Sequence, residues 1–321
     1  MDVYFTTVVR MAPHTEGGEI VRLDWDTKKV LARDPMVPTD PWVDDPNPRG
    51  NARGGRGIVQ VGRRLFAALY HSVRVFDREL NDLGRISNNL FVGLHEMSLS
   101  GDALWVASTA IDAAIKVDLE GSLIGDWWAR ENRNLQERFE LEPMRIDKNA
   151  DNRLLWLEQK VTRHPSHTHL NAVTPHNGDL YVLLNRFGAV YDITADRLVL
   201  ADERLAGCHN LAFVGEAMLI NDSRGSGLMV YDRRGSLERR IDLLEFPEIK
   251  ALRDKVRDAN LQKRPVFVRG LGAVNDRRVL LGISAATVVE IDLYTGELVD
   301  LFQYSPDVAV CVHGLAIWND S

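Results

Sequence analysis

His209-Asn-Leu-Ala-Phe opens a unit that recurs along this chain, and the recurrence decides the fold. The other openings place a histidine or an arginine before a short apolar run: Arg56-Gly-Ile-Val, His95-Glu-Met-Ser-Leu, His169-Leu-Asn-Ala-Val, Arg269-Gly-Leu-Gly-Ala-Val and His313-Gly-Leu-Ala-Ile. In every unit but the last, a second apolar run follows, and a third ends in an aspartate: Asp77, Asp118, Asp192, Asp232 and Asp292. A polar turn then leads to a fourth run. Repeats of roughly 40 residues with four short strands are typical of β-propeller blades.

The two ends of the chain together supply the sixth blade. The C-terminus contributes one strand, His313–Trp318, and the N-terminus contributes Val3–Arg10, Glu19–Asp24 and Lys28–Ala32. Joining the ends in this way closes the ring and leaves no open sheet edge between the first and last blade. We therefore predict an all-β fold, a single six-bladed β-propeller over residues 1–321. The alignment keeps His169 level with the other openings by giving its blade one extra turn residue within 174–179.

The composition fits one globular domain and argues against two kinds of partner. Hydrophobic residues make up 45% of the chain, which is an ordinary globular value, and a net charge of −7 disfavours a general nucleic-acid or membrane surface. No apolar run approaches the roughly 20 residues that span a bilayer, and the first residues lack the features of a signal peptide. The two cysteines, Cys208 and Cys311, make no disulfide framework. We expect a cytoplasmic protein with free thiols.

Three long insertions interrupt the repeat, at residues 34–55, 129–166 and 244–267. The third has a helical pattern, with Pro247 suited to a first turn and Ile249, Leu252 and Val256 on one face. Each insertion joins a fourth strand to the next first strand, so all three emerge on the face where the openings lie. We predict that they form a lid there. The alternative is that they only cover exposed apolar surface.

Histidine is rare in this chain, with nine residues in 321, yet it fills most of the opening positions. These positions start the innermost strands, which converge on the propeller axis. Neutral imidazoles that converge on one point are good ligands for Zn, Fe, Cu or Ni. We predict that one metal ion is bound by His95, His169, His209 and His313. The alternative is a polar tunnel in which the histidines hydrogen-bond to backbone or water.

Arginine occupies the two remaining openings, at Arg56 and Arg269. Arginine stays protonated and cannot ligate a metal, but its planar guanidinium binds carboxylate or phosphate in a bidentate way. Two arginines beside the histidines therefore favour a small anionic substrate. The alternative is an ion pair with an acidic neighbour such as Glu96.

Four further polar residues lie close to the openings and are candidates for the site. Strand alternation points Glu96 and Asn210 away from the axis, whereas Asn171 shares the side of His169. We predict that Asn171 and Asn210 contact substrate. Glu96 and His167, which is part of an Arg-His-Pro-Ser-His-Thr-His cluster, are the candidate catalytic groups.

The openings His209-Asn-Leu-Ala-Phe and His313-Gly-Leu-Ala-Ile resemble those of the NHL-repeat propellers, and they are most similar to the peptidylglycine amidating lyases. The resemblance covers the repeat pattern without the insertions. It implies a six-bladed frame in which histidines on the first strands of several blades bind a central metal. The lyase pattern has three ligands and a nearby tyrosine, whereas this chain offers four histidines and no matched tyrosine.

Three functions are compatible with this pattern. Four neutral imidazoles leave an Fe(II) or Cu site with open positions, which favours an oxygenase or other oxidoreductase. A Zn-dependent lyase or hydrolase with three histidine ligands and one histidine base is the second possibility. The third is a non-enzymatic propeller that binds a protein partner.

Overall fold

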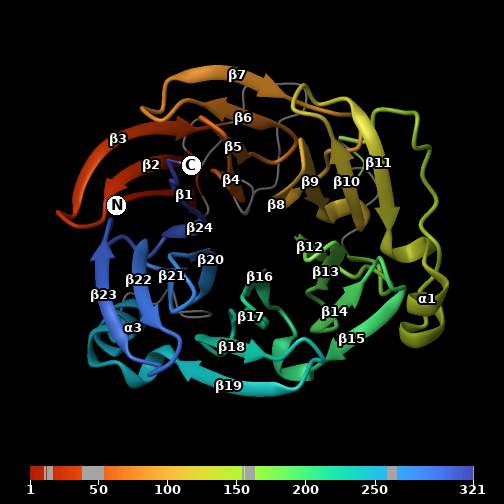
Figure 1. Ribbon diagram of the computed structural model, residues 1–321. Helices are drawn as coiled ribbons and strands as arrows, with labels where there is room; N and C mark the ends of the chain where they lie inside the picture. The colour runs from red at the N-terminus through yellow and green to blue at the C-terminus, as the bar shows by residue number, and fades with distance from the viewer. Residues whose placement is uncertain are drawn as a thin grey trace.

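The computed structural model describes residues 1–10, 12, 17–37, 54–153, 155, 163–258 and 266–320, except for the side chains of 256–258. It forms six four-stranded antiparallel sheets arranged as blades around a central axis (Figure 1). The predicted six-bladed propeller is thus confirmed.

Blades 1 to 3 follow the chain in order, each from the inner to the outer strand. Blade 1 is β4 (Ile58–Val61), β5 (Arg64–Ala68), β6 (Val73–Phe76) and β7 (Asp82–Ile86). Blade 2 is β8 (Leu94–Ser100), β9 (Ala103–Ser108), β10 (Ala113–Val117) and β11 (Leu123–Trp128). Blade 3 is β12 (Leu170–His176), β13 (Asp179–Leu184), β14 (Ala189–Asp192) and β15 (Arg197–Ala201).

Blades 4 and 5 repeat this order, and blade 6 combines the two ends of the chain. Blade 4 is β16 (His209–Val214), β17 (Ala217–Asp222), β18 (Gly227–Tyr231) and β19 (Leu237–Asp242). Blade 5 is β20 (Val268–Ala273), β21 (Arg278–Ile283), β22 (Thr287–Asp292) and β23 (Leu298–Gln303). Blade 6 is β24 (Val310–Ile317), β1 (Asp2–Val9), β2 (Gly18–Asp24) and β3 (Lys29–Met36), so the predicted closure by β1 on β24 is confirmed.

The core consists of six apolar wedges between neighbouring blades. Successive side chains of a strand point into the two wedges on either side of its blade. Val3 and Phe5 of β1 pack against blade 5, whereas Tyr4 packs against blade 1. Because both faces of each sheet are buried, the middle strands are continuous apolar runs rather than alternating ones. This burial accounts for the second apolar run of each repeat in the sequence.

The aspartate that ends each third run caps the turn that follows. Oδ1 of Asp77 accepts hydrogen bonds from the amides of Glu79 and Asn81, and Asp118 binds the amides of Glu120 and Ser122 in the same way. Short polar side chains of this kind stabilise turns by bonding to the backbone two residues on. The repeated aspartate is therefore a structural feature of the blade.

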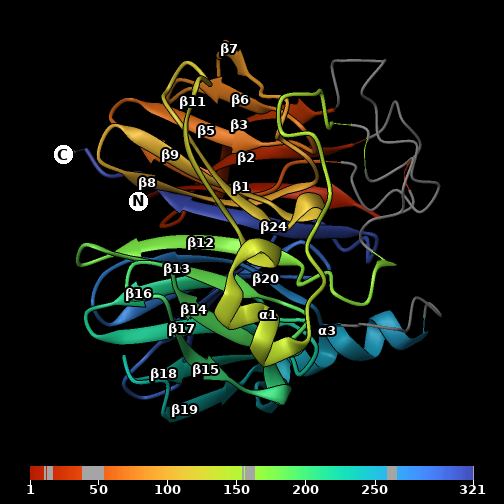
Figure 2. The same cartoon turned by 90° about the vertical axis from the view of Figure 1, so that its right-hand side faces the viewer.

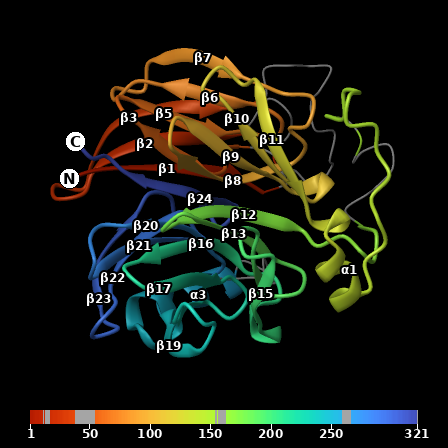
Figure 3. The ribbon, with the colours of Figure 1, turned by 45° about the vertical axis from the view of Figure 1, so that its right-hand side comes forward.

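The two described α-helices lie in the insertions. Helix α1 (Arg133–Phe139) lies beside the outer part of blade 3 (Figure 3). The ring of Phe139 stacks on that of Phe187 of this blade, with ring centroids 4.4 Å apart. Helix α3 (Pro247–Asp258) buries Ile249 and half-buries Leu252 against blades 4 and 5, as predicted, while the side chain of Val256 lies outside the described residues. The remaining helical turns are short 3-10 helices: Thr109–Ile111, Ala129–Glu131, Glu203–Leu205 and Leu243–Glu245.

The chain termini lie on one face of the propeller and α3 lies towards the other (Figure 2). Viewed along the axis, α1 and α3 lie near the circumference (Figure 1). Much of the predicted lid, including residues 38–53, 156–162 and 259–265, is outside the described residues, so the lid stays a prediction. None of the helices in the described part of the chain is long and apolar enough to cross a membrane.

Candidate active site on the propeller axis

A β-bulge interrupts the inner strand of several blades at the level of the openings. In blade 4, His209 pairs with Asn221 and Leu211 with Ile220, so Asn210 between them has no partner of its own. The pairings of β8 with β9, β20 with β21 and β24 with β1 shift at the same place. A bulge inserts one extra residue and changes the direction of the side chains around it.

Because of the bulge, Glu96 and Asn210 do not point away from the axis, contrary to the prediction from simple strand alternation. Both residues line a cavity of about 280 Å³ on the axis, whose wall includes residues of all six inner strands. The extra residue breaks the simple alternation of the strand, so the residues after His95 and His209 also face the axis. The cavity lies towards the ends of the inner strands, with Ser98 and His176 in its wall.

The four histidines of the openings meet at the axis. The ring centroid of His95 lies 5.4 Å from that of His169, 5.8 Å from that of His209 and 5.4 Å from that of His313. The rings of His209 and His313 are 6.4 Å apart. Four blades thus contribute one imidazole each to a single cluster, which we call the axial cluster.

The backbone position from which His169 enters this cluster differs from that of the other three histidines. Strand pairing places Leu170 at the level of His209, because Leu170 pairs with Leu184 and Asn171 occupies the bulge. His169 therefore lies one residue before the predicted level in the strand, which Leu170 occupies. His169 has a φ of +56°, in the left-handed region, and this conformation turns its ring towards His95.

Arg56 lies within the axial cluster. Its Nη1 is 3.0 Å from Nε2 of His95, and the side chain is buried. Since the guanidinium only donates, Nε2 of His95 is the acceptor. Burial, followed by the charge of Arg56, lowers the pKa of His95 well below its usual value, so this imidazole is neutral at neutral pH.

Arg269, which comes from blade 5, affects the same histidine rings through its positive charge. Its guanidinium carbon lies 4.6 Å from the ring centroid of Phe267. Burial is the main cause that lowers the pKa of His313, and of His169 to about 3, and the charges of Arg269 and Arg56 lower both further. The electrostatic potential of the arginines at the rings is therefore positive.

His313 and Glu96 face each other with pKa values shifted in opposite directions. Nδ1 of His313 is 3.7 Å from Oε1 of Glu96, and neither ring nitrogen of His313 has a hydrogen-bond partner among the described residues. Burial raises the pKa of Glu96 to about 8, although Arg269, Arg56 and a hydrogen bond with Asn210 oppose the shift. At pH 7 the base is neutral and the acid is largely protonated.

The two asparagines differ in what they contact. Oδ1 of Asn210 accepts hydrogen bonds from Nδ2 of Asn221 and from the amide of Gly270, both at 2.9 Å. Asn171 donates from Nδ2 to the carbonyl of Cys208 at 2.9 Å, and its Oδ1 has no partner among the described residues. Asn171 therefore keeps a buried acceptor available for a ligand, whereas Asn210 chiefly holds the bulge.

Two residues that support the cluster were missed in the sequence. The hydroxyl of Ser223 is 2.9 Å from Nδ1 of His209 and donates to the carbonyl of Val268, which fixes the imidazole hydrogen on Nδ1. Asp112 lies 3.5 Å from Nε2 of His167, and both side chains are buried. Both supporting residues come from loops of other strands, and no repeat position marks them.

The donor atoms of the cluster do not converge on one point. In the part of the chain that the structure describes, no three His, Cys, Asp or Glu side chains are arranged so that they could hold one metal ion. The contact of Arg56 with Nε2 of His95 is one reason, because it occupies a lone pair that a metal would need. Binding of a metal would require these side chains to rearrange.

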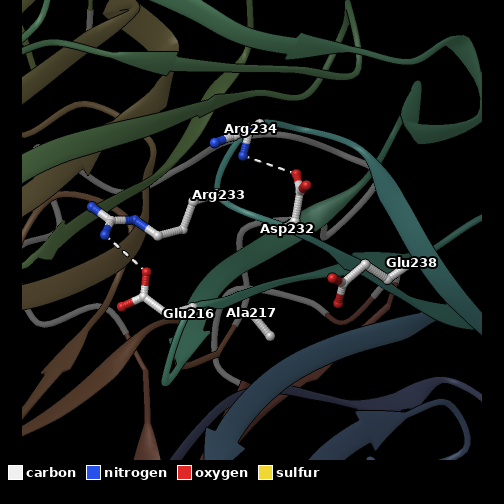
Figure 4. Close-up of a pocket in the computed structure, with 6 residues that line it drawn as sticks. All are labelled: Glu216, Ala217, Asp232, Arg233, Arg234 and Glu238. Atoms are coloured by element: carbon white, nitrogen blue, oxygen red, sulfur yellow. Dashed lines mark hydrogen bonds and ion pairs between the residues drawn. The ribbon is translucent and has the colours of Figure 1, made fainter.

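A second hollow, of about 310 Å³, lies on blade 4, and none of the axial residues lines it (Figure 4). Its wall contains Glu216, which pairs with Arg233 at 2.8 Å, and Asp232, which caps its own turn through the amide of Arg234. These groups satisfy each other, so we assign no ligand to this hollow.

Comparisons with known proteins agree with the fold. No family model matches the chain, and no curated protein matches it. Among solved structures, a protein of unknown function from Bacteroides caccae is 10% identical, with a TM-score of 0.60 over 98% of both chains. A chain of a nidogen/laminin complex is also 10% identical, with a TM-score of 0.60 over 99% of this chain and 98% of that one.

A third structure, the β-propeller domain of Cps50 (Swd1) from Myceliophteria thermophila, is 11% identical, with a TM-score of 0.50 over 92% of this chain and 89% of that one. At such identities these structures support the propeller fold and nothing finer. The narrower resemblance to the amidating lyases stays a prediction.

Proposed function

We propose that the axial cluster is the active site of an enzyme that binds a small anionic substrate and transfers protons to and from it, as lyases and hydrolases do. The observation that carries the proposal is the gathering of four imidazoles at the axis, three of them buried and that of His169 half-buried, under the positive charge of Arg56 and Arg269.

Binding of an anion is supported by the charges around the cluster. Arg56 touches His95 directly, and both arginines make the potential at the rings positive. A carboxylate or phosphate next to them would form charge-assisted hydrogen bonds, which are stronger than neutral ones. The negative charge of this group would also offset the free-energy cost of burying the positive charges.

Proton transfer is supported by the pairing of His313 with Glu96. A neutral imidazole can accept a proton, and a protonated carboxyl group 3.7 Å away can donate one. Environments that shift two neighbouring groups in opposite directions are a common basis for acid and base roles. Asn171, with its buried Oδ1, would orient the substrate from blade 3.

Thermal-shift and calorimetric titrations with inorganic phosphate and with acetate test the anion site. We expect wild-type protein to bind at least one of these probes, and Arg269→Met and Arg56→Met to lose most of that binding. Arg64→Met, on the same blade as Arg56 but part of the β5 surface, is the control. Equal binding by all four proteins would contradict the proposal.

A transition metal in the axial cluster is a second candidate, and Fe(II) oxygenase chemistry would follow from it, with Cu or Zn as the other ions. The specific observation in its favour is His313, whose two buried ring nitrogens have no partner among the described residues. Unsatisfied buried polar atoms are costly and often mark a missing ligand. Arg56 would have to release Nε2 of His95.

Metal analysis of protein purified without a His tag and incubated with Fe(II), Cu(II) or Zn(II) tests this candidate. If it is right, wild-type protein retains about one ion per chain. His209→Ala and His313→Ala should lose that ion, whereas the control His164→Ala should keep it. Retention of no ion by the wild-type protein would leave proton transfer without a metal as the function.

A further inference from the structure

Asp112 is a buried carboxylate at the start of blade 2's third strand, and it bonds to the segment that precedes β12. It follows the 3-10 helix Thr109–Ile111 and has left-handed backbone angles, with φ 53° and ψ 42°. Its side chain is fully buried. Oδ2 accepts the amide hydrogen of Thr168 at 2.9 Å, and Oδ1 accepts the Thr168 hydroxyl at 2.8 Å and the amide of Leu170 at 3.3 Å.

These hydrogen bonds bracket His169. The carboxylate binds the residues on both sides of it, Thr168 and Leu170, and so holds the backbone in the left-handed conformation that His169 adopts. A residue with a Cβ rarely takes this conformation unless its surroundings enforce it. The result is an imidazole whose centroid lies 5.4 Å from that of His95 although its position in the strand register differs.

The same carboxylate lies beside His167. Nε2 of His167 is 2.9 Å from the carbonyl of Thr109 and 3.5 Å from Oδ1 of Asp112. Both neighbours are acceptors, so Nε2 of His167 carries a hydrogen. The ring centroid of His167 is 5.5 Å from that of His169. Asp112 thus contacts one histidine directly and controls the next through the backbone.

We propose that Asp112 is a positioning residue of the axial site, which holds the ring of His169 in the cluster and, together with the carbonyl of Thr109, keeps a hydrogen on Nε2 of His167. The inference rests on the axial cluster being the functional site proposed above, but its first test needs no ligand. It also explains why a carboxylate is buried between two blades, where a plain apolar contact would otherwise be expected.

The first test is NMR of protein labelled with ¹⁵N in its histidine rings. Asp112→Asn keeps the volume but replaces one acceptor by a donor facing the Thr168 amide. We expect the ring resonances of His167 and His169 to shift and that of His209 to stay. The matched control is Asp192→Asn, since Asp192 is an equally buried carboxylate that caps a turn in blade 3. It should leave His167 and His169 unchanged.

A folded Asp112→Asn protein with unchanged His167 and His169 resonances overturns the proposal. If Asp112→Asn does not fold, Thr168→Val removes only the hydroxyl bond to Oδ1 and is read in its place. It should shift the same two resonances by a smaller amount, and the absence of any shift in that folded variant also overturns the proposal.

The second test links Asp112 to binding and uses inorganic phosphate as the probe. We expect Asp112→Asn to weaken phosphate binding roughly 10-fold, the lower end of the range for residues that orient others. In a His169→Ala background the same substitution should weaken phosphate binding by less, because the part of its effect that passes through His169 is already lost. An undiminished additional loss in that background contradicts positioning. Absence of phosphate binding in the wild-type protein would count against the proposed function and leave the NMR result standing.

Discussion

Arg56 and His95 come from neighbouring blades, and their side chains meet at the axis with Nη1 of Arg56 3.0 Å from Nε2 of His95. A cation beside an imidazole nitrogen opposes its protonation. The pair therefore couples the anion-binding arginine to the protonation state of the cluster. An anion bound at Arg56 would reduce this effect and raise the pKa of His95, so that substrate binding and proton uptake would favour each other.

Replacement of Arg56 by Met should raise the pKa of His95. Burial is the larger cause of the low value and remains, so the shift is upwards but stays below the usual histidine range. Titration of the His95 ring by NMR measures it. Arg64→Met on β5, where the guanidinium carbon lies 5.3 Å from the Phe66 ring centroid, is the control and should leave His95 unchanged. Equal pKa values of His95 in the Arg56→Met and Arg64→Met variants would refute the coupling.

Thr6, which is fully buried, lies where the two ends of the chain meet blade 1. Its hydroxyl donates to the carbonyl of Arg56 at 2.5 Å and accepts the amide of Gly314 at 2.9 Å, so it ties both ends of the chain to blade 1. Thr6→Val leaves those two backbone groups unsatisfied and should lower the free energy of unfolding by about 1–3 kcal/mol. Thr27→Val, in an exposed turn, should change it by less than about 0.5 kcal/mol. Urea denaturation followed by circular dichroism measures both. Equal effects would show that Thr6 has no special part in closure.

Glycine should be better tolerated than alanine at position 169. The φ of +56° at His169 costs a residue with a Cβ about 1 kcal/mol or more, whereas glycine adopts it freely. Both substitutions remove the ring, so the lost contacts cancel in their comparison. We expect His169→Gly to be more stable than His169→Ala by about 1 kcal/mol, the reverse of the usual order in a strand. At Ala172, within β12, the usual order should hold and Ala172→Gly should destabilise the protein. A less stable glycine variant at 169 would mean that the backbone relaxes there.

The blades could be predicted from the sequence because the interactions that form them are local and are repeated along the chain. Middle strands buried on both faces are continuous apolar runs, and each third strand ends at an aspartate that binds its own turn. Closure by β1 on β24 followed from counting the strands. The gathering of His95, His209 and His313 at the axis also followed, because equivalent positions of inner strands must meet there.

Features set by a single extra residue or by distant contacts could not be predicted. A bulge changes which side chains face the axis, so Glu96 and Asn210 were assigned to the wrong side. His169 was aligned one residue out, since its left-handed backbone is held by Asp112 of another blade. Such support comes from residues far apart in sequence, and a single chain carries no signal of it.

Acid should destabilise the protein partly through the aspartates that cap the blade turns. Hydrogen bonds lower the pKa of these carboxyls: chiefly from the side chain of Asn81 to Asp77, and from the backbone of Ser122 to Asp118 and of Ser236 to Asp232. Because the folded-state pKa of each carboxyl lies below the unfolded value of about 3.8, its contribution to the free energy of unfolding is complete above about pH 3.8. It is lost as the pH falls through the lower folded-state values. We therefore expect the melting temperature to drop as the pH falls below about 4.

The triple variant Asp77→Asn, Asp118→Asn and Asp232→Asn keeps neutral acceptors in the turns but cannot titrate. Its melting temperature should be below that of the wild type at pH 7, and the difference should shrink as the pH falls below about 4, because the wild-type carboxyls then also lose their charge. A triple change at exposed carboxylates, Asp102→Asn, Glu120→Gln and Glu238→Gln, alters the net charge equally and is the control. If the melting-temperature difference between the control variant and the wild type shrinks to the same extent at low pH, general charge repulsion rather than turn capping governs the acid sensitivity.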